Sequence, residues 1–160
     1  SVAEFNRYCS DTLACSINGD IDGALPVTAQ SLSTINGYTR WLSEKTGKRY
    51  RLPTRDEWVY AATASKVMED PNRNCFFSSR QIQKGDSLVR TSVGKQNGWG
   101  LVNYLGNAEE LVYEKSGKVS VVGGSYKNPM GECKISYWQQ HNGQPSDVTG
   151  FRIVRELTSK

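Results

Sequence analysis

The sequence predicts a loop-rich α+β domain in which helices come first and a small antiparallel sheet comes late. Three observations support this class. Two early segments have the spacing of helix capping boxes, residues 70–100 lack a regular pattern, and alternating apolar residues appear only after that segment. Helices and strands that are separated along the chain are typical of α+β folds.

The helix starts carry the clearest local signals. Ser1 and Glu4 form one capping box, and the helix that follows is expected to end near Asp11. Thr54 and Glu57 form a second capping box, which predicts another helix directly after it.

A further helix is expected over residues 32–46, between these two. Ser31 is a suitable N-cap, and Gly47 lies where the helix should stop. Large aromatic residues of the helices and of the C-terminal region are predicted to lie in the core: Trp41, Trp58, Tyr60 and Phe151. Arg152 is predicted to be a structural ion-pair partner.

The strand signals lie in the last third of the chain. Residues 111–114 and 118–122 flank a short turn and predict a hairpin. Residues 150–155 alternate apolar and charged side chains, which predicts a final half-buried strand. Residues 139–143 are polar and are expected to form a loop.

Composition limits the classes of function. The 160 residues carry a net charge of +4, from 20 basic and 16 acidic side chains. The main basic cluster, residues 45–51, falls at a helix end, so a nucleic-acid partner is not expected. No apolar run is long enough to span a membrane. The only histidine, His141, has no cysteine near it, which argues against a zinc site.

Four cysteines allow two disulfides in three possible connectivities. We favour Cys9–Cys15 with Cys75–Cys133, because the first pair closes a short local loop. The second pair would close a loop of roughly 58 residues and contribute about 4 kcal/mol in the chain-entropy model. The alternative is four buried free thiols in a cytosolic protein. Since disulfides persist in oxidising compartments, we expect an extracytoplasmic and periplasmic location.

Seven short blocks, in one order, resemble the formylglycine-generating enzyme (sulfatase-modifying factor) family. They are residues 2–9, 26–27 with 38–43, 50–54 with 57–58 and 60–62, 97–101, 105–110, 123–125 and 150–152. The resemblance implies a C-type-lectin-like α+β fold that forms one domain over residues 1–160. Because the chain starts abruptly at the first helix, we expect the domain to be excised from a longer chain.

The resemblance also implies a calcium site. In the family, the block equivalent to residues 105–110 supplies oxygen ligands, which would here be the side chains of Asn107 and Glu110 and the carbonyl of Ala108. Hard oxygen ligands suit Ca²⁺. The alternative is a carboxylate that only caps nearby amides.

The same resemblance argues against catalysis. The family binds copper through two cysteines after its Gly-Gly-Ser element, whereas residues 127–140 contain only Cys133. One thiol cannot form a bis-thiolate copper site, and Cys133 is also the expected partner of Cys75. We therefore expect no copper and no enzymatic activity.

What remains is a binding surface in the segment after Gly124. It mixes aromatic and amide side chains that suit contacts with peptides or carbohydrates, although ordinary exposed loops have such mixtures too: Tyr126, Asn128, Tyr137, Trp138, Gln140, His141 and Asn142.

These expectations together favour a non-catalytic extracytoplasmic sensor or protein-interaction domain. Its partner would be a protein or small ligand in the cell envelope. By resemblance, the parent would be a bacterial serine/threonine kinase or a signalling protein linked to type VI secretion. The alternatives are a divergent thiol-dependent oxidase and a diversity-generating display scaffold that varies residues 126–149.

Overall fold

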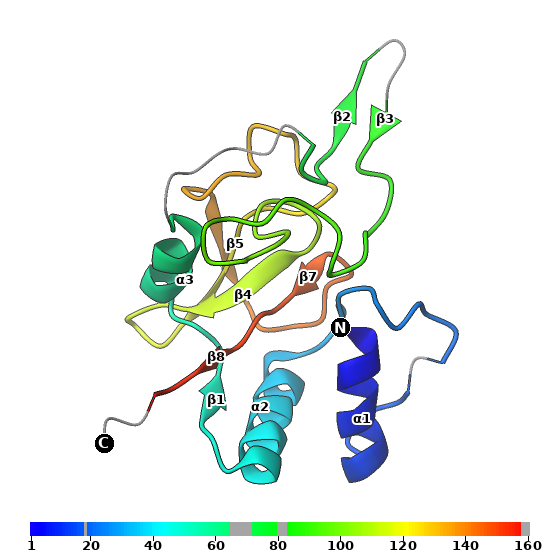
Figure 1. Cartoon of the computed structure of the whole chain (residues 1–160), viewed down its shortest axis with the longest axis vertical. Helices are drawn as coiled ribbons and strands as arrows, with labels where there is room; N and C mark the ends of the chain where they lie inside the picture. Colours follow the sequence, from blue (N-terminus) through cyan, green and yellow to red (C-terminus); the bar gives the residue numbers. More distant parts are fainter. Residues whose placement is uncertain (18, 65–71, 80–82, 158–160) are drawn as a thin grey trace.

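The computed structural model describes residues 1–17, 19–64, 72–79 and 83–157, with three helices in the first half and the main sheet in the second (Figure 1). The helices are α1 (Val2–Thr12), α2 (Leu32–Thr46) and α3 (Arg55–Ala62). All three begin at the predicted caps.

The capping geometry explains why these helices start where they do. The Thr54 hydroxyl accepts a hydrogen bond from the Glu57 amide at 3.2 Å, and the Glu57 carboxylate accepts one from the Thr54 amide at 2.8 Å. Ser1 and Glu4 form the equivalent box at α1. Gly47 ends α2 with a φ of 67°, a left-handed conformation that glycine adopts without strain.

The main sheet has four strands in the order β6-β5-β4-β7. The predicted hairpin consists of β4 (Glu109–Tyr113) and β5 (Val119–Val122), and β6 (Trp138–His141) extends it in antiparallel fashion. The short strand β7 (Thr149–Gly150) pairs with β4 in parallel. The sheet is therefore antiparallel except at one edge.

Two strand predictions were wrong in detail. Residues 139–143, expected to be a loop, begin within β6, whose exposed edge position requires no apolar pattern. The single strand expected over residues 150–155 is split, because the chain leaves β7 before it forms β8 (Val154–Arg155). That last strand pairs with β1 (Tyr50–Arg51) in a separate two-stranded sheet.

Buried side chains form three clusters around the elements. One joins α1 to α2, one lies between α3 and the sheet, and one lies between α2 and the sheet. Trp58 is central to the second cluster and is 1% exposed, as predicted. Tyr60 is 68% exposed, so its predicted place in the core was wrong; it lies on the outer side of α3.

Both predicted cysteine pairs are disulfides, Cys9–Cys15 and Cys75–Cys133. Cys75 and Cys133 are completely buried. Cys75 lies just before the small hairpin of β2 (Phe77–Ser78) and β3 (Gln83–Lys84), which projects at the top of Figure 1. The second disulfide thus ties the base of this hairpin to the segment that leads into β6.

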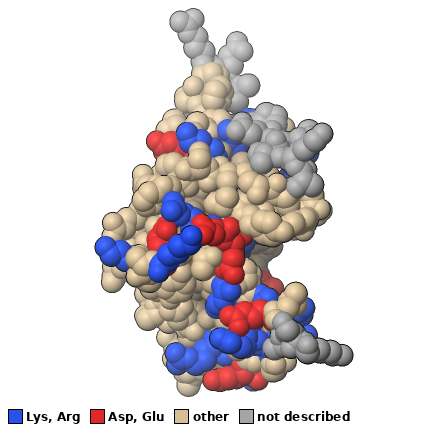
Figure 2. Space-filling model, turned by 90° about the vertical axis from the view of Figure 1, so that its left-hand side faces the viewer, with Lys and Arg blue, Asp and Glu red and all other residues tan. Residues whose placement is uncertain are grey.

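Ion pairs connect the last strand to the start of α3. The Arg51 guanidinium donates to both oxygens of Glu57 at 2.7 Å and to Glu156 at 2.8 Å. This arginine lowers the pKa of Glu57 to about 2. On the side of the molecule where α3 lies, acidic and basic side chains are intermixed (Figure 2).

No helix in the described part of the chain has both the length and the apolar character needed to cross a membrane.

Candidate functional site

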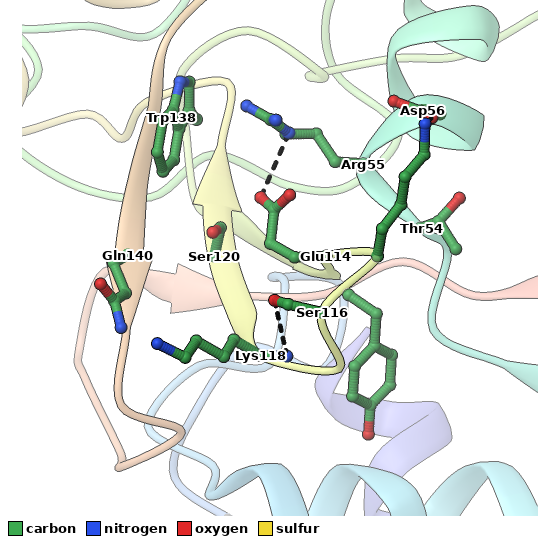
Figure 3. A pocket seen from close by; sticks show the side chains of 11 residues that line it. Thr54, Arg55, Asp56, Glu114, Ser116, Lys118, Ser120, Trp138 and Gln140 are labelled. Carbon is green, nitrogen blue, oxygen red and sulfur yellow. Dashed lines mark hydrogen bonds and ion pairs between the residues drawn. The ribbon is translucent and has the colours of Figure 1, made fainter.

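A hollow of about 490 Å³ lies between the start of α3, the turn after β4, and β6 (Figure 3). We call it the Trp138 hollow. Side chains from the start of α3, from β4, β5 and β6, and from the turn between β4 and β5 line it: Thr54, Arg55, Asp56, Tyr113, Glu114, Lys115, Ser116, Lys118, Ser120, Trp138 and Gln140. An isolated parallel β-bridge between Thr54 and Tyr113 holds the start of α3 against the end of β4.

Strand geometry places Trp138 and Gln140 together in this hollow. They are two residues apart on β6, so their side chains lie on the same face of the sheet. Gln140 is opposite Ser120 on β5, and the Ser120 side chain forms part of the floor. Half of the Trp138 surface, 50%, remains exposed.

Arg55 fixes the orientation of the tryptophan ring. It is the first residue of α3, and its guanidinium carbon lies 4.7 Å from the centroid of the Trp138 ring. Such a cation–π contact is worth about 0.5–1 kcal/mol at an exposed site. The Arg55 Nε atom also lies 3.1 Å from Glu114 Oε1.

The carboxylate of Glu114 is only partly satisfied. Its Oε1 atom forms the ion pair with Arg55, but the angles are not those of a hydrogen bond, and no other group in the described residues bonds to this buried oxygen. Buried acceptors without a hydrogen bond are uncommon in proteins. Glu114 Oε1 is therefore paired with Arg55 but accepts no hydrogen bond from the described residues.

The rim of the hollow carries two lysines with different surroundings. Lys115 forms an exposed ion pair with Asp56 at 2.9 Å. The Lys118 side chain extends toward Gln140 (Figure 3), and none of the described residues is its ion-pair partner. The uncompensated charge at this rim is therefore positive.

The structure brings only two of the seven predicted surface residues into this hollow, namely Trp138 and Gln140. His141 and Asn142 lie at the end of β6, where their side chains accept hydrogen bonds from the amides of Gly143 and Gln144 at 3.0 Å. These two side chains organise a turn.

The other three predicted surface residues belong to the loop before β6. The Asn128 side chain accepts from the Ser125 amide at 2.8 Å and donates to the Tyr137 hydroxyl at 3.1 Å. Tyr126 lies beneath the ammonium group of Lys127, 5.6 Å from it. Asn128 and Tyr137 thus stabilise the loop, and only Trp138 and Gln140 of the predicted residues line the Trp138 hollow.

The residues predicted to bind calcium are engaged with protein groups. The Asn107 side-chain oxygen accepts from the Val89 amide at 2.8 Å and from the Asn74 side chain at 3.1 Å. Its nitrogen donates to the Val89 carbonyl at 3.1 Å. Asn107 therefore holds the neighbouring loop in place, and Ala108 is buried next to it.

Glu110 is held still more firmly. Its two carboxylate oxygens accept from Arg152 Nε and Nη2 at 2.6 Å, and one of them also accepts from Trp58 Nε1 at 2.6 Å. Burial disfavours the charge of Arg152, but the paired carboxylate outweighs this effect and raises the pKa of Arg152. Arg152 is thus the structural ion-pair partner that the sequence predicted.

This arrangement does not fit a calcium ion. Both oxygens of Glu110 already face a cation, and the oxygen of Asn107 already accepts two hydrogen bonds. Over the described ranges, no group of three or more His, Cys, Asp or Glu side chains is suited to a metal. Calcium at Asn107, Ala108 and Glu110 stays a prediction without structural support.

Sequence reasoning missed Arg55, Glu114, Lys118 and Ser120 as site residues. Arg55 follows a recognised N-cap, and the other three lie in the predicted hairpin, so each was placed on the correct element. Their proximity to Trp138 depends on the pairing of β6 with β5. If β6 had been predicted, its pairing with β5 would have indicated that these residues lie near Trp138.

Comparison with solved structures shows the same fold in three other proteins. A structure of PvdO from Pseudomonas aeruginosa is 20% identical with a TM-score of 0.72, covering 98% of this chain and 77% of that one. A structure of CarF is 23% identical with a TM-score of 0.71, covering 90% and 72%. Variable protein 1 of Treponema denticola is 15% identical with a TM-score of 0.67, covering 88% and 74%.

At these identities the similarity shows the fold alone, and no match was found among curated proteins. A family model for the sulfatase-modifying factor enzyme 1-like domain matches residues 10–157, which is most of the chain. The chain therefore belongs to the family of sulfatase-modifying factor enzyme 1-like domains.

Proposed function

We propose that this chain is a non-catalytic ligand-binding domain that acts outside the cytoplasm and binds through the Trp138 hollow. One observation carries the proposal: a half-exposed tryptophan, oriented by Arg55, lies in the same hollow as the buried and unsatisfied Glu114 Oε1 atom. An aromatic face beside hydrogen-bonding groups is the usual composition of a ligand site.

The cysteines support a non-catalytic role. All four are in disulfides. The region in which the family has two copper-binding cysteines contains only Cys133 here, and Cys133 is bonded to Cys75. A thiol-dependent oxidase needs free thiolates to hold a soft metal. The divergent oxidase is therefore the weaker alternative.

Two disulfides also support an oxidising compartment. Among oxidising compartments we propose the bacterial periplasm. The domain would serve there as the sensor or interaction part of an envelope signalling protein. A serine/threonine kinase or a protein linked to type VI secretion would be its parent. This finer assignment rests on the family resemblance.

A display scaffold is the second candidate, and one observation favours it. The fold is shared with a protein named variable protein 1, and both Trp138 and Gln140 lie within residues 126–149. Sequences from clonal isolates would separate the two ideas. Substitutions concentrated in residues 126–149 favour the scaffold, and an even spread favours a fixed ligand.

The proposed site is tested by two tryptophan variants with equally exposed rings. Ligands are first selected on the wild-type domain from an oligosaccharide array and a displayed peptide library. Trp138→Ala should weaken their binding by about tenfold or more, because truncation of a central aromatic residue typically has an effect of this size. Trp99→Ala is the matched control, since Trp99 is 51% exposed but lies outside the hollow.

Equal losses in both variants, or no loss in Trp138→Ala, would contradict the site. The non-catalytic assignment has its own test, the oxidation of a cysteine-containing peptide in the presence of copper. We expect no turnover by the oxidised domain and no free thiols by mass spectrometry. Turnover that disappears in Cys133→Ser would revive the oxidase.

A further inference from the structure

Strand β6 is an open edge of the main sheet. The order β6-β5-β4-β7 leaves β6 and β7 as the two edges. Both residues of β7 are buried, and a side chain at Gly150 would lie 3.2 Å from the Val27 carbonyl oxygen, so this edge is covered. In β6, three of the four residues are exposed and His141 is half-buried.

The direction of the backbone groups along β5 follows from one hydrogen bond. The Glu114 amide donates to the Lys118 carbonyl at 2.8 Å, which marks a hydrogen-bonded pair at the hairpin turn. Because such pairs alternate along an antiparallel ladder, Ser120 also directs its backbone groups toward β4. Val119 and Val121 therefore direct theirs toward β6.

The same alternation fixes the backbone direction in β6. His141 and Gln139 are opposite Val119 and Val121, so they bond to β5. The backbone N–H and C=O groups of Trp138 and Gln140 consequently point away from the sheet. Within the described residues, none of these outward groups has a hydrogen-bond partner.

This edge also lacks the features that usually prevent strand pairing. Native edges are commonly protected by lysine, by proline or by a covering segment. The residues of β6 are Trp-Gln-Gln-His, without a lysine, an acidic residue or a proline. A peptide in extended conformation could therefore form backbone hydrogen bonds with Trp138 and Gln140.

The surroundings of the edge indicate the chemistry of such a peptide. A second hollow, of about 850 Å³, lies on the other side of Arg55 and Trp138 and has apolar walls from Val59, Leu105 and Ile135. Side chains of an added strand alternate between two faces, so those on the Trp138 face would lie beside both hollows. This arrangement favours apolar side chains at alternate positions.

The charged side chains around β6 indicate a second property of the peptide. Lys118 lines the first hollow and Lys134 the second, and neither has an ion-pair partner in the described ranges. The nearby carboxylates, Asp56 and Glu114, are already paired with Lys115 and Arg55. The unpaired charges on either side of Trp138 are thus both positive and favour acidic side chains in the ligand.

We propose that β6 binds an extended peptide segment of a partner protein, which adds a strand at this edge and carries acidic residues among alternating apolar ones. Backbone hydrogen bonds to Trp138 and Gln140 supply the affinity, and the two hollows with Lys118 and Lys134 supply the specificity. The proposal rests on the proposed function and names its class of ligand.

The first test uses a random decapeptide library displayed on phage and selected on the intact, oxidised domain. Enriched sequences should combine acidic with apolar residues. Amide hydrogen exchange by NMR then reports the pairing directly: upon binding, exchange at Trp138 and Gln140 should slow by about tenfold or more. The amides of Gln139 and His141, which already bond to β5, should change little.

A pair of variants at one position isolates the backbone contribution. Gln140→Pro removes the outward N–H, which an edge strand tolerates, whereas Gln140→Ala removes only the side-chain amide. The proline variant should bind the selected peptides about tenfold more weakly than the alanine variant, because one hydrogen bond is lost. Thermal unfolding of both variants shows whether the fold is retained.

Unchanged exchange at Trp138 and Gln140 in the presence of a bound peptide overturns the proposal, as does a library without enriched peptides. Equal affinities of folded proline and alanine variants do the same. If an oligosaccharide binds instead, and Trp138→Ala but not Gln140→Pro abolishes that binding, the proposed function stands while strand addition fails. If the wild-type domain binds none of these ligands, both the proposed function and strand addition are contradicted.

Discussion

Two arginine–glutamate pairs lie at opposite ends of β4, and they differ in how completely the protein satisfies them. Glu110 receives three hydrogen bonds at 2.6 Å, from Arg152 and Trp58, and its side chain is 8% exposed. Glu114 has one contact with Arg55 at 3.1 Å and keeps a buried oxygen without a hydrogen bond. The first pair is fully hydrogen-bonded within the fold, whereas the second leaves one carboxylate oxygen without a hydrogen bond from the described residues.

The largest expected effect comes from Arg152→Ala. It leaves the buried carboxylate of Glu110 without its counter-ion, which should lower the free energy of unfolding by about 3–5 kcal/mol. Urea denaturation measures this change. The matched control is Arg55→Ala, whose partly exposed pair should contribute about 1 kcal/mol or less. Similar losses in the two variants would remove the distinction between the pairs.

Trp58→Phe should have the next largest effect on stability. The phenyl ring retains most of the packing but cannot donate to Glu110, and the loss of one hydrogen bond to a charged group costs about 1.5–3 kcal/mol. Trp138→Phe is the control, because no hydrogen bond from its indole nitrogen to the described residues is present. Thermal unfolding of both variants would show the difference, and an unchanged Trp58→Phe would mean that Arg152 alone satisfies Glu110.

Glu114→Gln should separate stability from binding. The free energy of unfolding should change by about 0.5 kcal/mol or less, as at other partly exposed sites. Binding of ligands selected on the wild-type domain should weaken by about tenfold, since a hydrogen bond to a charged group is stronger than one to a neutral amide. Isothermal titration calorimetry measures this affinity, and a large stability loss would show that Glu114 is structural.

Glu109 extends the comparison to a carboxylate without an arginine. Burial raises the pKa of Glu109 above its ordinary value, although the hydroxyl of Thr149 and the charge of His141 act against this. Its contribution to stability is therefore full below the unfolded-state pKa near 4.5 and is lost as pH rises through the folded value.

Glu109→Gln should accordingly gain stability relative to the wild type as pH rises from about 4 to about 7. The variant keeps the side-chain oxygen that accepts from Thr149. Unfolding free energies at several pH values test this, and parallel curves for the two proteins would show that the pKa of Glu109 is not raised.

The sequence was a good guide wherever local chemistry decides the structure. The caps at Ser1, Ser31 and Thr54 fixed the three helices, and the hairpin around the turn at 114–118 formed as expected. Strand β6 was missed because an exposed edge needs no apolar alternation. The predicted core position of Tyr60 was wrong, because this residue faces outward from α3.

The candidate site was only partly predictable, because its geometry depends on contacts between distant segments. Trp138 and Gln140 were identified from their chemistry, but Arg55 reaches them across more than eighty positions of the chain. Nothing in the sequence indicated that Arg152 and Trp58, 42 and 52 positions away, would bond to the carboxylate of Glu110. Calcium binding at this block stays a prediction.

The Cys75–Cys133 disulfide has a consequence for biosynthesis. Its roughly 4 kcal/mol is a large share of the 5–15 kcal/mol by which a typical domain is stable. A newly made chain that stays in a reducing cytosol lacks this link and is exposed to proteases and chaperones there. Export and oxidation would thus act as a quality-control step, after which the segment leading into β6 is anchored and the domain is ready to bind.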